Sequence, residues 1–562
     1  MQQFNSRPKL TLTGAELIVK ILENFGITTV SGIPGGAILP FYDALGQSKT
    51  IKHILTRHEQ AAGFIAQGMT RTSGKPAVCL ASSGPGATNL LTAIADAKLD
   101  SIPIVCITGQ VSSSTIGTDA FQEVDTYGIS IPITKHNYLV RSIEELPNII
   151  QNAFRIAQSG RPGPVWIDIP KDIQTATIKI DSLPEYPKIE HSSDLIHNLI
   201  TQAADLINQA NNPVLYLGGG IVFADAHKYA EQLAEKANIP TTTTLMALGS
   251  IDSEHPLSLG MLGMHAKRST NFILQEADLL IVLGARFDDR AIGKTAEFCP
   301  NAKIIHVDID RAELGKIRQP DIAINADVAQ VLELLLPQIA AQSRTSWLTR
   351  VNQLQQQYPS FHHSDELLNH YGLIKAVANI AGSDAIITTD VGQHQMWVAQ
   401  AYPFSQPRQL LTSGGLGTMG FGLPAAIGAA IEAPKRKVIC FTGDGSIMMN
   451  IQELATMAEH NLDIKIILLN NQALGLVYQQ QTLFYGERIF SSTSPYQADF
   501  IKIAQGFGIK ACQLNQQEDP LQALTIALNS VGPCLIQVDI DINEKVYPMV
   551  PPGAANIEMV GE

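Results

Sequence analysis

The sequence predicts an α/β protein made of three doubly wound domains, each with a mostly parallel sheet. Apolar, β-branched runs alternate with helical patterns along nearly the whole chain, as in parallel sheets that are covered on both faces. The length of 562 residues exceeds what one hydrophobic core serves and corresponds to about three domains. The composition agrees, because 45% of the residues are hydrophobic, only 16% are charged, and Gly and Pro number 43 and 30.

The strand-like runs fall into three blocks. We predict an N-terminal domain at 1–180, a central domain at 199–340 and a C-terminal domain at 369–562. Polar, weakly patterned stretches around 175–198 and 341–368 predict linkers between them. The first and third blocks have a similar size and texture. Ligands of open parallel sheets bind at the carboxyl ends of the strands, so functional residues are expected directly after the apolar runs.

Charge and cysteine usage exclude several classes of protein. A net charge of −13 argues against a nucleic-acid binder, which needs a basic face. Six cysteines without a CxxC pair predict a reducing compartment, and the first ten residues lack the apolar core of a signal peptide, so a cytoplasmic location is expected. The uncharged stretch from Gln409 to Ile431 is long enough for a membrane span. Its six glycines and one proline instead predict a Gly-rich loop that leads into a buried helix, and no membrane segment.

Two strand ends in the third block predict a metal site. The run "KVICFTGDG" ends in Gly443-Asp444-Gly445, and "DIKIILLNN" ends in Asn470-Asn471. A right-handed crossover brings both ends to one edge of the sheet. A carboxylate, an amide oxygen and a main-chain carbonyl are hard ligands suited to Mg²⁺, which completes its shell with phosphate oxygens. A Gly-Asp-Gly triplet alone is typical of a turn, whereas this arrangement over 27 residues is far more specific.

This arrangement resembles the thiamine-diphosphate-binding motif of the pyruvate-decarboxylase-like enzymes. The resemblance implies that Asp444, Asn471 and the carbonyl of Ala473 hold Mg²⁺, and that Met419 bends the cofactor into a V. It also implies the following contacts to thiamine diphosphate: Gly392, Gln393, His394, Gly417, Met419, Gly443, Asp444, Gly445, Ser446, Asn471, Ala473, Leu474, Gly475, Leu476 and Val477.

The first block supplies a candidate for activating that cofactor. In "RHEQAA", Glu59 opens an apolar helix, and from local pattern alone it is a partner of the helix dipole. The segment also matches the catalytic glutamate motif of the same enzymes, and "SSGPGATN" matches the loop that follows it. By this resemblance Glu59 hydrogen-bonds the aminopyrimidine and favours its imino tautomer, which lets the cofactor deprotonate its own thiazolium carbon.

The middle block lacks GxGxxG, the fingerprint of a simple NAD site. Its segments "MLGMHAKRSTNF", "GARFDDR", "HVDID" and "NADV" follow or end strand-like runs and resemble the FAD-binding segments of acetohydroxyacid synthases. In that family the flavin is mainly structural. The resemblance implies that FAD is lined by Arg161, Gly219, Gly220, Thr244, Leu245, Leu262, Gly263, Met264, His265, Gly284, Ala285, Arg286, Asp288, Asp308, Ile309, Asp327 and Val328.

Further segments extend the resemblance over essentially the whole chain: "IGTDAFQEVDTYGISIPITKHNYLV", "GRPGPVWIDIPKDIQ", "DVGQHQMWVAQ" and "VPPGAANIEM". They are similar to the catalytic large subunits of acetohydroxyacid (acetolactate) synthases, most like the isozyme I type. The implied fold is that of the thiamine-diphosphate enzymes, with pyrimidine-binding, FAD-binding and diphosphate-binding domains. The implied partners are a second copy of the chain, which shares the sites, and a separate small regulatory subunit.

The implied reaction decarboxylates pyruvate and joins the hydroxyethyl unit to a second 2-oxoacid. Pyruvate gives 2-acetolactate and 2-oxobutyrate gives 2-aceto-2-hydroxybutyrate, the first common step of branched-chain amino-acid biosynthesis. By the same resemblance Arg290 binds the carboxylate of the second substrate, while Phe121, Gln122 and Lys171 line the pocket and its entrance. An ordinary ion pair of Arg290 with Asp288 or Asp289 is the alternative.

Gln480 stands where many members of the family carry tryptophan, whose ring packs against the extra methyl group of 2-oxobutyrate. An amide there predicts weak preference for 2-oxobutyrate, unless Gln480 is simply a solvated loop residue.

Two rival functions remain to be weighed. A thiamine-diphosphate/FAD pyruvate oxidase is disfavoured by the GTDAFQE and FDDR segments. A catalytically inactive scaffold is disfavoured by the joint presence of Glu59, Asp444, Asn471 and Arg290.

Overall fold

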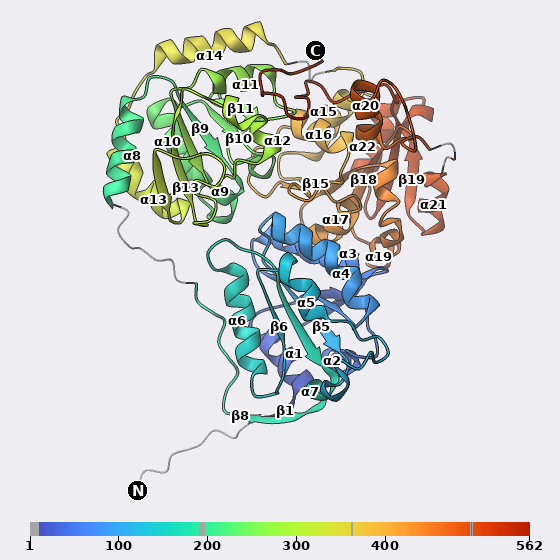
Figure 1. The fold of residues 1–562 in the computed structure, drawn as a ribbon. Coiled ribbons are helices and arrows are strands. Elements are labelled where there is room, and N and C mark those ends of the chain that lie inside the picture. The colour runs from blue at the N-terminus through green and yellow to red at the C-terminus, as the bar shows by residue number, and fades with distance from the viewer. Residues whose placement is uncertain (1–9, 190–196, 361–363, 495, 497, 562) are drawn as a thin grey trace. The chain divides into compact units, whose positions relative to one another are not determined.

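The computed structural model describes residues 10–189, 197–360, 364–494, 496 and 498–561 (Figure 1). The expectation for the first ten residues, and parts of the two expected linkers, lie outside this range. The chain forms two compact units. So far as the structure describes them, the first takes in residues 1–190, 413–434 and 449–462, and the second residues 191–412, 435–448 and 463–562.

The first unit is built on a six-stranded, wholly parallel sheet in the order β3-β2-β4-β5-β7-β6. Its central strands are buried along their whole length, because helices cover both faces. The strands are β2 (Thr29–Gly32), β3 (Lys52–Leu55), β4 (Ala77–Ala81), β5 (Ile104–Gln110), β6 (His136–Leu139) and β7 (Val165–Pro170). The helices are α1 (Gly14–Asn24), α2 (Leu39–Gly46), α3 (Glu59–Ser73), α4 (Pro85–Leu99), α5 (Thr126–Ser130), α6 (Leu146–Gln158), α7 (Lys171–Thr175), α17 (Gly422–Glu432) and α19 (Leu454–Glu459).

The uncharged stretch expected to form a loop and a buried helix does so, which confirms that prediction. It leads into α17, whose residues from Gly422 to Ala430 are all buried. The helix packs on α3 at main-chain distance, since a Cβ atom at Gly68 would overlap the carbonyl of Ala425, and one at Gly428 would overlap that of Ile65. Among the described residues, no helix is long and apolar enough to cross a membrane.

Asp168, at the centre of β7, is a fully buried carboxyl group in the first unit. Thr108 donates a hydrogen bond to its Oδ1 at 2.6 Å, and Gln110 donates one to its Oδ2 at 2.9 Å. Burial outweighs these hydrogen bonds and raises the pKa of Asp168 to about 7.

This raised pKa predicts a pH dependence of stability. Between about pH 4 and pH 7 the folded chain holds a proton on Asp168 that the unfolded chain has lost, so stability falls as the pH rises through this window, by up to about 1.4 kcal/mol per pH unit. Asp168→Asn removes this titration and is expected to flatten the slope between pH 5 and pH 7. Urea unfolding at several pH values measures it, and equal slopes for both proteins would contradict the assignment.

The second unit holds two further six-stranded parallel sheets. The central one has the order β11-β10-β9-β12-β13-β14, and the last has the order β16-β15-β17-β18-β20-β19. The central strands are β9 (Pro213–Leu217), β10 (Thr241–Thr243), β11 (Ser258–Met261), β12 (Leu279–Leu283), β13 (Lys303–Asp308) and β14 (Ile322–Asn325). The last six are β15 (Ile386–Thr389), β16 (Leu410–Leu411), β17 (Val438–Gly443), β18 (Ile464–Asn470), β19 (Lys510–Gln513) and β20 (Cys534–Asp539).

Helices cover both of these sheets. Those of the central region are α8 (His197–Gln209), α9 (Gly219–Phe223), α10 (His227–Ala237), α11 (Arg268–Gln275), α12 (Asp289–Ile292), α13 (Val328–Leu335) and α14 (Thr345–Gln357). Those of the last region are α15 (His370–Ala381), α16 (Gln393–Ala401), α18 (Asp444–Ile447), α20 (Gly475–Phe484), α21 (Phe500–Gly506) and α22 (Pro520–Asn529).

The strand orders indicate where ligands of these sheets would bind. Numbered along the chain within each sheet, the first and last sheets share the order 2-1-3-4-6-5, and the central sheet has the order 3-2-1-4-5-6. In each sheet the order reverses at one point, where the loops after two neighbouring strands diverge and leave a crevice. These points lie between β2 and β4, between β9 and β12, and between β15 and β17.

The two expected linkers are more ordered than we predicted. In the first, β8 (Thr177–Ile180) pairs antiparallel with β1 (Leu10–Thr13). In the second, α14 buries Trp347, Val351 and Leu354, a helical repeat that the surrounding Gln and Ser residues obscure. The Trp347 indole also donates a hydrogen bond to the carbonyl of Pro213 at 3.1 Å, so this helix belongs to the central core.

Candidate active site

Asp444 and Asn471 meet in the second unit, at the ends of two neighbouring strands. Gly443 pairs with Leu469 across β17 and β18, so the residues that follow come together. The main-chain N–H groups of Asn471 and Ala473 lower the pKa of the Asp444 carboxyl, but burial dominates and raises that pKa to about 6. A largely buried carboxylate with this cost of desolvation fits a divalent cation, which would restore the lost solvation.

Gln393 holds Asn471 in place. The Asn471 Nδ2 donates to Gln393 Oε1 at 2.9 Å, which fixes the amide and turns its Oδ1 toward the N–H of Ala473, 3.3 Å away. Gly475 lies against the same amide, and a Cβ atom there would displace the Gln393 amide from its contact with Asn471. Ser446 is anchored by donating to the carbonyl of Val391 at 2.5 Å.

His394 follows β15 at the reversal point of the last sheet. It is buried, desolvation lowers its pKa to about 3, and its Nε2 has no hydrogen-bond partner within the described chain. Gly443 lies beside it, since a Cβ atom there would approach His394 Nδ1 to 3.0 Å. A neutral imidazole with an unpartnered nitrogen is a polar contact that a bound diphosphate or its metal water shell would satisfy.

Glu59 lies in the first unit, where it opens α3 as predicted. His58 caps the helix by accepting the N–H of Gln60 at 3.1 Å, so the Glu59 side chain is not used as the cap. Its Oε2 instead accepts a hydrogen bond from Asn89 Nδ2 at 2.9 Å. A Cβ atom at Gly86 would approach Glu59 Oε1 to 3.5 Å, so this glycine keeps the approach to that oxygen open.

The loop after β5 borders this glutamate. Gln122 has a φ of +60°, and its carbonyl lies within 2.8 Å of where a Cβ atom of Gly84 would be. Phe121 is 89% exposed, and Lys171, the first residue of α7, is also exposed. Asp172 ties α7 to the loop by accepting the N–H of Ser113 at 2.9 Å. The three predicted pocket residues are thus all exposed in the first unit.

Gly417 and Met419 lie on a loop of the first unit that is anchored to α4. Asp100 accepts the N–H groups of Gly414 at 3.0 Å and Gly415 at 2.7 Å, and it also pairs with the buried Arg71 at 2.7 Å. Asp96 accepts from the hydroxyl of Thr418 at 2.9 Å. Buried carboxylates therefore fix the position of Met419.

The predicted flavin residues gather at the reversal point of the central sheet. Gly220 and Gly284 touch through their backbones, because a Cβ atom on either would come within 2.6 Å of the other's Cα. Gly284 has a φ of +58°, which favours glycine. Beside them the buried Thr244 Oγ1 has no partner within the described chain. A main-chain cradle with an unsatisfied hydroxyl fits the phosphates and ribityl chain of a flavin nucleotide.

The remaining flavin candidates follow neighbouring strands. Asp308 ends β13 and accepts the N–H of Asp310 at 2.8 Å, and Asp327 caps α13 by accepting the N–H of Ala329 at 2.9 Å. The structure also brings together the following candidates around the same strand ends: Gly219, Leu245, Leu262, Gly263, Met264, His265, Ala285, Arg286, Asp288, Ile309 and Val328. Arg161 is the exception, since it belongs to the first unit, where its Nε donates to Ser101 Oγ at 2.8 Å.

Arg290 and Gln480, the two residues proposed to meet substrate, are both exposed in the second unit. The Arg290 side chain approaches Asp289 only at 3.8 Å, and both are mostly exposed, so this ion pair contributes little. Asp288 accepts the N–H of Arg290 as a helix cap at 3.1 Å. The guanidinium is therefore available to a ligand.

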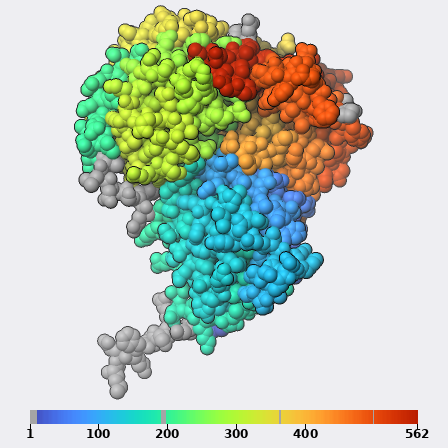
Figure 2. All heavy atoms as spheres, in the orientation of Figure 1, coloured from blue at the N-terminus to red at the C-terminus, as the bar shows by residue number. Residues whose placement is uncertain are grey.

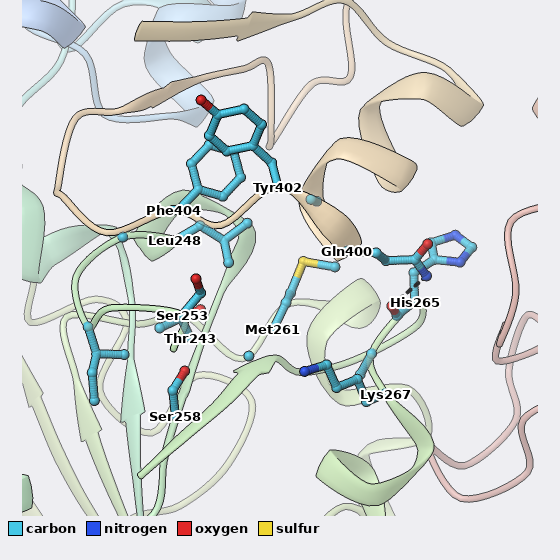
Figure 3. A pocket seen from close by; sticks show the side chains of 15 residues that line it. Thr243, Leu248, Ser253, Ser258, Met261, His265, Lys267, Gln400, Tyr402 and Phe404 are labelled. Atoms are coloured by element: carbon cyan, nitrogen blue, oxygen red, sulfur yellow. Dashed lines mark hydrogen bonds between the residues drawn. The ribbon is translucent and has the colours of Figure 1, made fainter. Parts of the chain in front are cut away.

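A cavity of about 60 Å³ lies at the carboxyl ends of β10 and β11, beside the predicted flavin residues (Figure 3). Gln400 and His265 border it and are joined by a 3.0 Å hydrogen bond from Gln400 Nε2 to the His265 carbonyl. Lys267 lines the same space, and burial lowers the pKa of its amine.

The sequence did not single out three polar residues that form hydrogen bonds to candidate residues or to the main chain near them. Asn89 lies inside the quoted SSGPGATN motif, and Gln400 ends the DVGQHQMWVAQ motif, so each could have been found there. Gln479 is 1% exposed and immediately precedes Gln480, but a run of three glutamines gives no sign of which one is buried.

Three regions of the chain match models of known protein families. Residues 12–129 match the thiamine pyrophosphate enzyme N-terminal TPP binding domain, residues 200–335 the central domain, and residues 390–538 the C-terminal TPP binding domain. With three parallel sheets and matches to all three domains, the chain is a thiamine pyrophosphate enzyme.

Individual relatives show which kind of thiamine pyrophosphate enzyme the chain resembles most. The acetolactate synthase isozyme 1 large subunit of Escherichia coli (strain K12) is 67% identical over 551 residues, which cover 98% of each chain. The isozyme 2 large subunit of the same strain is 46% identical, over 98% of this chain and 99% of that one. A probable acetolactate synthase large subunit of Methanocaldococcus jannaschii is 44% identical, over 96% and 94%. The chain belongs to the acetolactate synthase large subunits.

Proposed function

We propose that the chain is the catalytic subunit of an acetolactate synthase of the branched-chain amino-acid pathway. It decarboxylates pyruvate and joins the two-carbon unit to a second 2-oxoacid, either pyruvate or 2-oxobutyrate. The observation that carries the proposal is the buried Asp444 beside Asn471 at two neighbouring strand ends, together with Glu59 at the start of α3.

The chain's own residues do four things in this reaction. Asp444, Asn471 and the Ala473 carbonyl would hold Mg²⁺, which would supply positive charge to neutralise the diphosphate of thiamine diphosphate. This cofactor supplies a nucleophilic carbon when bound. Glu59 would accept and return a proton at the aminopyrimidine, and Asn89 orients its carboxylate by donating to Oε2. Arg290 binds the carboxylate of the second substrate through its exposed guanidinium.

FAD binds the central sheet in this proposal and has a structural role. The glycine contact between Gly220 and Gly284 and the unpartnered Thr244 hydroxyl support a nucleotide there. We also propose a homodimer with shared sites, a separate small regulatory subunit, and a cytoplasmic location.

An assay of products tests the function. The purified chain with Mg²⁺, thiamine diphosphate, FAD and pyruvate should form acetolactate, which acid converts to acetoin. Formation of acetate and peroxide instead would establish the rival pyruvate oxidase, and no consumption of pyruvate with all cofactors bound would establish an inactive scaffold.

Gln480→Trp tests the choice of second substrate. A ring at this exposed position would pack against the extra methyl group of 2-oxobutyrate, a discrimination worth about 1–3 kcal/mol. With pyruvate and 2-oxobutyrate supplied together, the ratio of 2-aceto-2-hydroxybutyrate to 2-acetolactate should rise roughly tenfold or more. Gln517→Trp, at an exposed position with a purely local hydrogen bond, is the control. An unchanged ratio in Gln480→Trp would make Gln480 a solvated residue without a role.

A further inference from the structure

Residues 544–550, here named the C-terminal strap, form no strand, yet side chains of the second unit bind their main chain throughout. Five consecutive carbonyls, from residue 544 to residue 548, each accept a side-chain hydrogen bond. The donors, in the order of the carbonyls, are Gln393, Trp397, Gln479, Gln400 and His265, at 2.8, 3.4, 3.0, 3.1 and 3.4 Å. In Figure 2 the C-terminal residues, in dark red, lie at the surface between the central region in green and the last region in orange.

Three of these donors form one face of α16. Gln393, Trp397 and Gln400 are spaced i, i+4 and i+7, so their side chains project along one side of the helix. The strap therefore runs along α16, held through its main chain as well as by the buried side chains of Val546, Met549 and Val550. A side chain replaced in the strap would leave these bonds in place, whereas a lost donor would leave a carbonyl without its partner.

Gln479, on α20, makes the fullest contact. Its Nε2 donates to the Val546 carbonyl at 3.0 Å, and its Oε1 accepts the Val546 N–H at 2.9 Å. The same Oε1 also accepts from Gln393 Nε2 at 3.3 Å. The side chain is 1% exposed, so each of these groups would be left in a dry environment without it.

The strap links the two predicted cofactor sites. At one end Gln393 binds both the Glu544 carbonyl and the Asn471 amide, which belongs to the metal and diphosphate site. At the other end the Val550 N–H donates to the Met264 carbonyl at 2.9 Å, and Gln400 binds the carbonyl of His265. Met264 and His265 are predicted flavin contacts. One chain segment thus touches groups from both sites.

We propose that Gln479 is a positioning residue that fastens the C-terminal strap and thereby couples the binding of FAD to the binding of thiamine diphosphate and Mg²⁺. The proposal rests on the proposed function, because it takes both cofactor sites from it. Order imposed on the strap by one cofactor lowers the cost of ordering it for the other, and such coupling is reciprocal.

The test compares cofactor binding in the full-length wild type and Gln479→Met, which keeps the volume but removes the amide. Flavin fluorescence quenching gives the FAD dissociation constant with and without saturating thiamine diphosphate and Mg²⁺. The wild-type constant is expected to tighten at least roughly fivefold, at the low end of known couplings. In Gln479→Met this factor should fall toward one. Gln517→Glu, an exposed glutamine whose hydrogen bond is local, should retain the wild-type factor.

A second variant separates positioning from mere loss of packing. In Gln479→Glu the carboxylate faces the Val546 carbonyl without a proton, so coupling should be lost at pH 8. Burial raises the pKa of such a carboxyl, and once protonated it can donate to the Val546 carbonyl and accept from its N–H as glutamine does. Coupling should therefore return toward the wild-type factor at pH 6. The hydrogen-bond partners of Gln479 in the described chain are the Val546 main chain, Met549 and Gln393, none of which titrates, and the ionisable Glu544, Lys545 and Tyr547 of the strap are common to both proteins.

The outcomes are distinct. A wild type that binds both cofactors and forms acetolactate without any coupling refutes this inference and leaves the proposed function intact. A Gln479→Met protein with wild-type coupling also refutes it. If that variant does not fold, Gln400→Met makes the same test, because it removes the bonds of Gln400 to the strap carbonyl of Tyr547 and to the carbonyl of His265. A wild type that binds neither cofactor refutes the proposed function itself.

Discussion

Glu59→Gln should lower the rate of acetolactate formation by roughly 10²–10⁴-fold, the range attributed to general acid–base catalysis. The substitution keeps the shape of the side chain and its contact with Asn89, but an amide cannot accept the proton that a carboxylate accepts. Stability should change little, because His58 and not Glu59 caps α3. Steady-state kinetics with pyruvate, together with thermal unfolding and cofactor titration, measure the effect.

Glu144→Gln, which alters an exposed carboxylate of the same unit, is the matched control and should keep wild-type activity. Asn89→Ala should fall between the two, since it frees Glu59 without removing its carboxylate. Acetolactate formation by Glu59→Gln at the wild-type rate would show that proton transfer to the cofactor does not involve this residue.

Asp444→Asn should weaken the binding of Mg²⁺ and of thiamine diphosphate more than about 100-fold. At ordinary cofactor concentrations this loss of affinity should abolish activity. Residues that merely support a metal ligand typically contribute 10–100-fold, and Asp444 is the only charged group among the three predicted ligands. The cofactor-free variant should be no less stable than the wild type, because burial raises the pKa of this carboxyl and so opposes its ionisation in the folded chain.

The measurement is the shift in unfolding temperature on adding thiamine diphosphate and Mg²⁺. Ligands that bind only the folded state stabilise it by mass action, so the wild type should gain stability and the variant should not. Asp384→Asn removes an exposed carboxylate of the same unit, which pairs with Arg436, and should behave as the wild type. Equal shifts in Asp444→Asn and the wild type would place the metal elsewhere.

Residues of the site that follow strands could be predicted because the rule that places them is local. Asp444 and Asn471 each end an apolar run, and the handedness of the crossover brings them together whatever the rest of the chain does. The fold class followed in the same way from alternating strands and helices. The assignment of individual flavin and thiamine diphosphate contacts depended on resemblance, and it stays a prediction.

Other features depend on contacts that no local pattern contains. Gln479 binds a main chain that lies 67 residues further on, and nothing near it in sequence distinguishes it from the exposed Gln480. The sequence predicts a linker where α14 lies, because only three buried residues interrupt its Gln-rich surface. A periodic pattern of apolar residues appears only where a broad face of a helix or strand is buried. Elements held by a few buried side chains or by main-chain hydrogen bonds therefore show no such pattern.

The contact between α3 and α17 has a consequence for how the first unit tolerates change. Glu59 begins α3, and Met419 lies just before α17, so the spacing of these helices sets the separation of a proposed base from a proposed cofactor contact. The helices can come this close because Gly68 and Gly428 have no side chain at the contact. One added carbon at either of these inner positions would meet the main chain of the facing helix, push the two helices apart and change that separation from a distance.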